Sequence, residues 1–89
     1  MRMRLDVFLK QSRLIKRRTI AKAMCDEGRV TVNGQQAKAG DTVHVGDMIG
    51  IRFGDRTMAV RVLKVEQVIG KQGADALYER LDEPLKDSP

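Results

Sequence analysis

Residues 12–34, SRLIKRRTIAKAMCDEGRVTVNG, contain the local signals that decide the fold of this chain. Apolar residues recur at helical spacing in the middle of the stretch. They predict a helix from Arg17 or Arg18 to Glu27 whose inward residues are Ile20, Ala23 and Met24. Gly28 then ends the helix, because glycine readily adopts the left-handed conformation that often follows a last helical turn.

The second half of the stretch predicts a β-hairpin. Residues 29–32 alternate polar and apolar, with Val30 and Val32 inward. The pair Asn33-Gly34 is among the strongest signals for a two-residue turn between antiparallel strands. Residues 35–38 are therefore expected to form the returning strand.

The predicted helix begins in a concentration of positive charge. Lys16, Arg17 and Arg18 stand where the helix dipole favours negative charge, a conflict that costs roughly a few tenths of a kcal/mol per exposed charge. A phosphate group would resolve the conflict, because it would meet unpaired backbone N–H groups and these cations together. The alternative is a frayed first turn with hydrated cations. We favour phosphate binding.

The flanking residues predict a small α+β domain. Asp6 is a good helix N-cap, and apolar spacing after it predicts a first helix over 6–11. Alternating residues predict strands over 48–53 and 57–64, while 43–45 can form only a brief strand or an extended loop. Apolar residues at helical spacing, Ala74, Leu77, Tyr78 and Leu81, predict a last short helix.

The expected architecture is two short N-terminal helices feeding a small, mainly antiparallel β-sheet, followed by a short C-terminal helix. We expect residues 1–65 to form one small domain. Residues 66–89 should add the last helix and a loose tail. Met1 and Met3 are both possible starts.

The excess of positive over negative charge is confined to the first half of the chain. Residues 1–38 carry ten Lys and Arg against three Asp and Glu, a net +7, whereas residues 39–89 carry seven against nine, a net −2. Charge that served only solubility would not divide in this way, so we expect a polyanionic partner. A lipid surface is the weaker candidate, because no long apolar run or strongly hydrophobic amphipathic helix accompanies the cations.

The residues capable of chemistry do not form a recognisable catalytic or metal site. Cys25 is the single cysteine, and its apolar neighbours indicate a buried small side chain. His44 is the single histidine and lacks partners at metal-ligand spacing. We therefore expect no catalytic residue, no metal and no cofactor, and a binding protein rather than an enzyme. The sequence has no secretion signal or membrane-length apolar run, which predicts a cytoplasmic protein without a membrane partner.

Among nucleic acids, folded RNA agrees best with the composition. Three scattered aromatic residues cannot supply the stacking platform that single-strand binders use. The predicted second helix, ended early by Gly28, is short for the recognition helix of a helix-turn-helix protein. RNA held through its phosphates and its shape is the remaining class.

The run from Arg4 to Lys38 resembles the RNA-binding domain named after ribosomal protein S4. The shared elements are RLD at residues 4–6, a basic helix start, and the motif G-x-V-x-V-N-G at residues 28–34. Within this superfamily, the short length and the segment SRLIKRRT resemble the RqcP family of bacterial ribosome-associated quality-control factors. A related heat-shock family shares the RLD and N-G elements but has a longer C-terminal end and an aromatic-rich first helix.

The resemblance implies a non-catalytic RNA-binding factor of ribosome rescue. Its implied partners are large ribosomal subunits obstructed by peptidyl-tRNA, their rRNA, the peptidyl-tRNA, and a factor that adds alanine tails to the stalled nascent chain. A monomer is expected. The implied RNA-binding residues are Arg4, Arg13, Lys16, Arg17, Arg18, Lys22, Asn33, Gly34 and Lys38. For Asp6 we favour a helix cap, with the orientation of a nearby arginine as the alternative.

Three other functions remain open from the sequence. The first is a heat-shock-type factor that recycles large subunits, and the second is a basic module that meets an acidic protein. The third is an enzyme fragment, because S4-type domains often precede pseudouridine synthase or synthetase domains.

Overall fold

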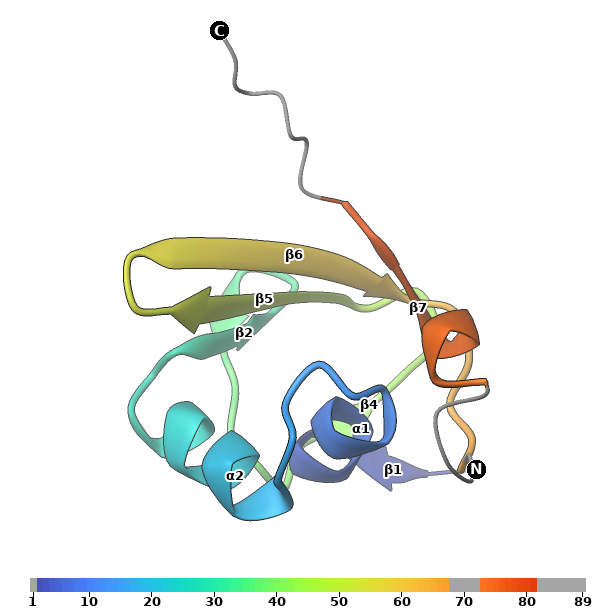
Figure 1. Cartoon of the computed structure of the whole chain (residues 1–89), viewed down its shortest axis with the longest axis horizontal. Coiled ribbons are helices and arrows are strands. Elements are labelled where there is room, and N and C mark those ends of the chain that lie inside the picture. The colour runs from blue at the N-terminus through green and yellow to red at the C-terminus, as the bar shows by residue number, and fades with distance from the viewer. Residues whose placement is uncertain (1, 68–72, 82–89) are drawn as a thin grey trace, which may run out of the picture.

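Two helices cover one face of a five-stranded sheet in the computed structural model, which describes residues 2–67 and 73–81 (Figure 1). The helices are α1 (Leu5–Gln11) and α2 (Arg18–Asp26). The sheet has the order β3-β2-β5-β6-β7, with all neighbours antiparallel, and consists of β2 (Val30–Val32), β3 (Gln35–Gln36), β5 (Met48–Phe53), β6 (Arg56–Val62) and β7 (Tyr78–Arg80). Two further strands, β1 (Met3–Arg4) and β4 (Thr42–Val43), form a separate antiparallel pair. Two helices with a mostly antiparallel sheet agree with the expected α+β class.

Helix α1 begins one residue earlier than expected, and Asp6 is not its N-cap. Arg4 occupies the N-cap position and makes no side-chain cap. The backbone N–H of Leu5 donates to Asp41 O at 2.8 Å, and that of Asp6 donates to Ala39 O at 3.1 Å. Because a neighbouring segment of backbone accepts these bonds, the first turn needs no capping side chain there. The N-cap prediction for Asp6 was therefore wrong.

Helix α2 has nearly the predicted bounds but turns a different face to the core. Ala21 and Cys25 are buried, Met24 is half-buried, and Ile20 is 46% exposed. Ala23, also expected inward, is exposed. The buried pair has small side chains at i and i+4, which lets α2 approach α1 closely. The predicted inward set was therefore wrong for Ile20 and Ala23, while Met24 lies at the border of the buried face.

The hairpin after α2 forms as predicted. Asn33 has φ 54° and Gly34 has φ 85°, the two positive values that a type I′ turn requires. Gly28 has φ 76°, as expected for a residue that ends a helix. The returning strand β3 is shorter than the predicted 35–38, because the chain turns at Lys38, whose backbone N–H donates to Asp41 Oδ2 at 2.9 Å. Strands β5 and β6 lie within one or two residues of their predicted bounds.

The predicted C-terminal helix over 74–81 is wrong. A single 3-10 turn covers Ala74–Leu77, and the chain then enters β7. Register pairs Val62 with Tyr78 and Val60 with Arg80, so the segment adds an edge strand to β6. Ala74 and Leu77 are buried as the spacing indicated, but that spacing suits a 3-10 turn leading into a strand as well as a helix. The loose tail expected over 82–89 lies outside the described residues.

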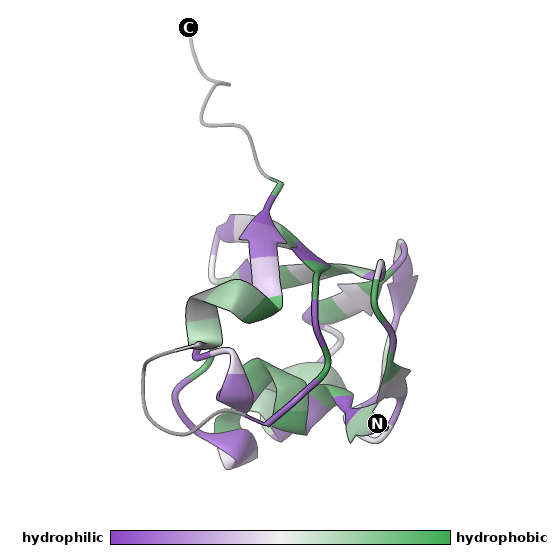
Figure 2. Ribbon diagram, turned by 90° about the vertical axis from the view of Figure 1, so that its right-hand side faces the viewer, coloured by the Kyte–Doolittle hydropathy of each residue, from purple (hydrophilic) through white to green (hydrophobic). Residues whose placement is uncertain are grey.

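The core lies between the helices and the sheet and consists almost entirely of aliphatic side chains around Phe8. Its fully buried members include Leu5, Leu9, Val30, Ile51, Val60, Val62 and Leu77. Leu77 therefore packs into the same core as residues 3–62, although it lies in the segment after position 65. Strand β7, next to the C-terminal trace in Figure 2, is largely hydrophilic. Charged side chains are typical of an edge strand, because they discourage pairing with another chain.

Candidate nucleic-acid interface

A buried carboxylate lies at the centre of the predicted RNA-binding cations. Asp6 is 1% exposed, and its carboxylate accepts hydrogen bonds from Arg4 Nε and Arg18 Nε at 3.1 Å each. The backbone N–H of Val7 also donates to it at 2.8 Å. Burial raises the pKa of Asp6, but the hydrogen bonds and charges of the two arginines outweigh burial and hold its pKa below the usual value. Asp6 therefore orients arginines, the alternative role considered for it.

Arg4 and Arg18 are brought together from elements twelve or more residues apart. Arg4 belongs to β1 and Arg18 begins α2, yet both guanidiniums contact the same carboxylate. Their side chains remain 50% and 54% exposed. Arg18 uses only Nε in this contact, so its two terminal amino groups stay available for a ligand. Each arginine thus supports the fold and presents donors at the surface.

The start of α2 continues this positive surface. Arg17 occupies the N-cap position without a side-chain cap, and the first turn contains no acidic residue. Lys16 and Arg17 are exposed, and within residues 2–67 and 73–81 no carboxylate lies within 4.0 Å of either cation. Unpaired N–H groups at a helix start, next to free cations, are suited to binding an anion.

A groove beside α2 adds Lys22 and Lys38, two more of the predicted residues, to Arg4. It has a volume of about 620 Å³ and is lined by Arg4, Lys22 and Lys38, with Asp26 as its acidic residue. Cys25 lies in its wall, and burial raises the pKa of this thiol to about 11. Arg4 connects the groove to the Asp6 cluster, because its guanidinium contributes to both. We name Arg4, Lys16, Arg17, Arg18, Lys22 and Lys38 the cation cluster.

Arg13 lies apart in the turn between the helices. It has φ 62°, and its backbone N–H donates to Lys10 O at 3.0 Å, while Ile15 N donates to Leu9 O at 3.1 Å. This left-handed turn folds the chain back so that α2 packs on α1. The Arg13 side chain is exposed.

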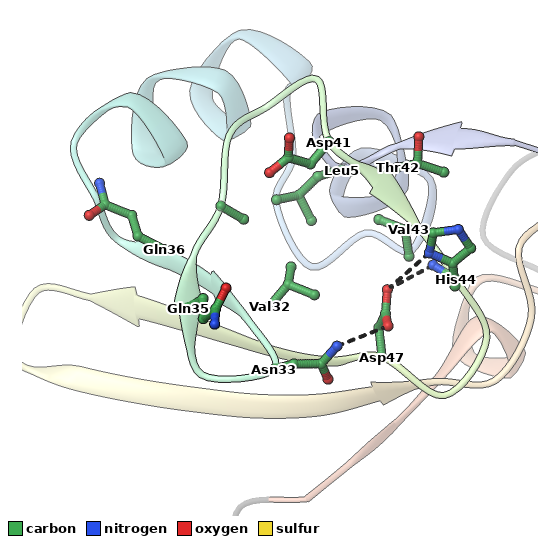
Figure 3. A pocket seen from close by; sticks show the side chains of 11 residues that line it. Leu5, Val32, Asn33, Gln35, Gln36, Asp41, Thr42, Val43, His44 and Asp47 are labelled. Atoms are coloured by element: carbon green, nitrogen blue, oxygen red, sulfur yellow. Dashed lines mark hydrogen bonds and ion pairs between the residues drawn. The ribbon is translucent and has the colours of Figure 1, made fainter.

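The hairpin tip lies on a different groove from the cation cluster (Figure 3). Asn33 Nδ2 donates to Asp47 Oδ1 at 3.1 Å, and Met48 N donates to Asn33 Oδ1 at 3.0 Å. Both polar atoms of the side chain therefore fasten the hairpin to the start of β5. The groove, of about 410 Å³, also contains Asp41 and His44, so its charge differs from that of the first groove. The RNA contacts expected of Asn33 and Gly34 stay predictions.

Sequence reasoning missed three features of this surface. The structure alone shows that two arginines share Asp6. It also shows that Asp26 and Gly40 line the groove beside α2. The spacing R-x-D at residues 4–6 was the available signal for the first. In the described part of the chain, no cluster of three His, Cys, Asp or Glu could hold a metal ion. No helix there is both long and apolar enough to cross a bilayer.

Comparison with known proteins gives one family model and several near full-length relatives. Residues 3–49 match the S4 domain. The chain is 52% identical over 87 residues to the RQC P-site tRNA stabilizing factor of Halalkalibacterium halodurans, covering 97% of this chain and 99% of that protein. The protein of the same name from Bacillus subtilis is 48% identical over 81 residues, 91% and 94% of the two chains. The trimeric structure of Vibrio cholerae heat shock protein 15 superposes with a TM-score of 0.84 at 33% identity, covering 91% and 83%.

Proposed function

The chain belongs to the S4 domain family, and on that premise we propose that it binds RNA on large ribosomal subunits obstructed by peptidyl-tRNA. Near full-length similarity to RQC P-site tRNA stabilizing factors supports this assignment, because it extends beyond the S4 domain to almost the whole chain. The protein contacts rRNA and tRNA there and supports alanine tailing of the stalled nascent chain, without catalysis of its own. Its location is the cytoplasm, where these subunits are.

The cation cluster is the observation that carries the proposal. Its six members come from β1, the start of α2, the body of α2 and the segment after β3, and the fold gathers them on and beside one helix. Half-exposed arginines held by a buried carboxylate offer fixed donors, which suit the phosphates of a folded RNA. The lysines add charge without fixed geometry, which favours affinity over sequence selection.

Lys16 and Arg17 are the best positions for a test, because neither holds another part of the protein in place. We expect Lys16→Gln/Arg17→Gln to reduce co-sedimentation with purified large subunits carrying peptidyl-tRNA. The slope of log affinity against log salt should fall by about 1.4 to 1.8, that is, 0.7 to 0.9 for each lost phosphate contact. Arg4 and Arg18 are poorer positions, since removing either leaves Asp6 with less compensation.

The matched control is Arg56→Gln/Lys64→Gln, which removes two exposed cations outside the cluster. It lowers the net charge equally, so a non-specific effect of charge would weaken both double variants alike. Equal co-sedimentation of the two variants would refute the proposed site. Unchanged binding of the Lys16/Arg17 variant would refute the proposed function of the cluster.

A large-subunit recycling role is the second candidate, favoured by the likeness to the Vibrio heat shock protein. Alanine tailing of a stalled reporter chain separates the two, because only the first role requires it. The Vibrio protein is trimeric in its solved structure, whereas we propose a monomer here; light scattering after gel filtration decides this. Nuclease treatment of a pull-down tests the alternative that the protein is a basic module for acidic proteins. Such protein partners would remain bound after digestion of RNA.

A further inference from the structure

The face of the sheet turned away from the helices carries a small hollow with two arginines. Val30 and Ile51 are register partners and both are buried on the inner face. Side chains alternate along a strand, so the next pair, Arg29 and Arg52, points to the outer face. The backbone continues the ladder there, because Arg52 N donates to Arg29 O at 2.9 Å. The hollow has a volume of about 170 Å³ and is lined by Gly28, Arg29, Thr31, Gly50, Arg52 and Thr57.

The two arginines are cross-strand neighbours of like charge, an arrangement that destabilises a sheet unless it is neutralised. Glu27 Oε1 lies 2.8 Å from Arg29 Nε, but within residues 2–67 and 73–81 no carboxylate lies within 4.0 Å of Arg52. Elsewhere on the same face an arginine is neutralised across the strands, because Arg61 Nη1 in β6 lies 3.0 Å from Glu79 Oε2 in β7. The hollow therefore concentrates positive charge that the protein itself only partly neutralises.

The other groups lining the hollow suit phosphate. Thr31 and Thr57 place hydroxyl groups beside the guanidiniums, and hydroxyls and guanidiniums are the usual side-chain donors to nucleic-acid phosphates. A Cβ at Gly50 would lie 2.7 Å from Thr31 Oγ1, so glycine is what leaves this hydroxyl in its position. Ala59, the register partner of Gly50, is also small. Thr31, Gly50 and Ala59 thus form a row of small residues beside the arginines, which leaves room for a phosphate group.

We propose, on the basis of the RNA-binding function proposed above, that this hollow binds a phosphate group of RNA as a contact separate from the cation cluster. Helices α1 and α2, beside which the cluster lies, are on one side of the sheet (Figure 1). The Arg29–Arg52 pair faces the other side, because Val30 and Ile51 next to it are buried on the helix side. One RNA strand cannot follow a straight path over both surfaces. A single protein molecule therefore holds two RNA segments, one on each face.

Capture of two RNAs tests this inference. A biotinylated RNA hairpin is immobilised on beads, the protein is added, and capture of a second, fluorescent hairpin is measured. We expect the natural protein to capture it and Arg52→Gln to capture about tenfold less, the loss expected for one charge-assisted hydrogen bond. Binding of the immobilised hairpin alone should change less than twofold. The matched control is Arg56→Gln, which removes an exposed arginine of the same β5–β6 strand pair. It should leave both measurements unchanged.

The outcomes separate this inference from the proposed function. If the natural protein binds one hairpin but captures no second, or if Arg52→Gln captures as well as the natural protein, the outer-face contact is refuted and the cation cluster is unaffected. If the protein binds no hairpin at all, the proposed function fails as well. In a second arm, poly-glutamate and inorganic phosphate compete for the Arg52-dependent step. Displacement by poly-glutamate at equal charge concentration, without displacement by inorganic phosphate, would overturn the assignment to RNA in favour of an acidic protein.

Discussion

The variant Asp6→Asn tests whether the buried carboxylate positions the RNA-binding arginines or only offsets their charge. The carboxylate accepts hydrogen bonds at 3.1 Å from Arg4 Nε and Arg18 Nε, and a longer one at 3.4 Å from Arg4 Nη2. A hydrogen bond to a charged group contributes roughly 1.5–3 kcal/mol. Both guanidiniums are half-exposed and keep part of their hydration, so we reduce the expected loss of unfolding free energy to about 2 kcal/mol in total. For a domain of this size, that loss lowers the melting temperature by about 8–16 °C.

The RNA affinity of the same variant separates the two roles by sign. If Asp6 only offsets charge, its removal strengthens binding by roughly 0.5 kcal/mol for a phosphate about 8 Å away in water, or about twofold. If Asp6 positions the arginines, their terminal amino groups lose their fixed orientation. We then expect affinity to fall about tenfold, the equivalent of one charge-assisted hydrogen bond.

The assay is fluorescence anisotropy with an rRNA hairpin at fixed salt, at a temperature where circular dichroism shows both proteins folded. Asp26→Asn is the matched control, because it removes an exposed carboxylate that lines the groove beside α2 and should raise affinity about twofold. If Asp6→Asn binds RNA as tightly as Asp26→Asn does, the positioning role is wrong.

The structure makes three further predictions. Because the pKa of Asp6 is lowered from 3.8 on folding, its contribution to stability is complete above about pH 4 and is lost as the pH falls through the folded value; acid titration followed by circular dichroism should show a steeper loss for the natural protein than for Asp6→Asn. Gly50→Ala should destabilise the sheet by about 1–3 kcal/mol through the 2.7 Å approach to Thr31 Oγ1, and adding Thr31→Ala should recover most of that loss in urea denaturation, whereas additive losses would contradict the clash. Leu77→Ala should lose about 2–5 kcal/mol, because Leu77 is fully buried; a loss no larger than that of the exposed Ala76→Gly would show that the segment after position 73 is not part of the core.

Local signals in the sequence predicted the elements that depend on local geometry. The turn at Asn33-Gly34 and the helix end at Gly28 need positive φ, and the residues that tolerate it are visible in the sequence. The bounds of β5 and β6 likewise follow from alternation. These elements are the ones whose conformation a few neighbouring residues decide.

The largest errors involve contacts between distant segments. The inward face of α2 was predicted from apolar spacing as Ile20, Ala23 and Met24, but packing on α1 buries Ala21 and Cys25. The last segment was predicted to be a helix from its apolar spacing, but residues 78–80 pair with β6 as a strand. Asp6 was assigned a local cap, but it serves an arginine twelve residues later in the chain. The cations themselves were identifiable from their charge; their sharing of one carboxylate was not.

The position of β7 in the sheet has a consequence for synthesis. Its residues 78–80 complete the edge of β6, and Leu77 just before them completes the core. A ribosome makes residues 77–80 after all the other strands, so those strands lack their final neighbour while this segment is still being translated. The finished domain can therefore assemble only after its own C-terminal segment has emerged from the exit tunnel, and until then β6 presents an open edge to other nascent chains.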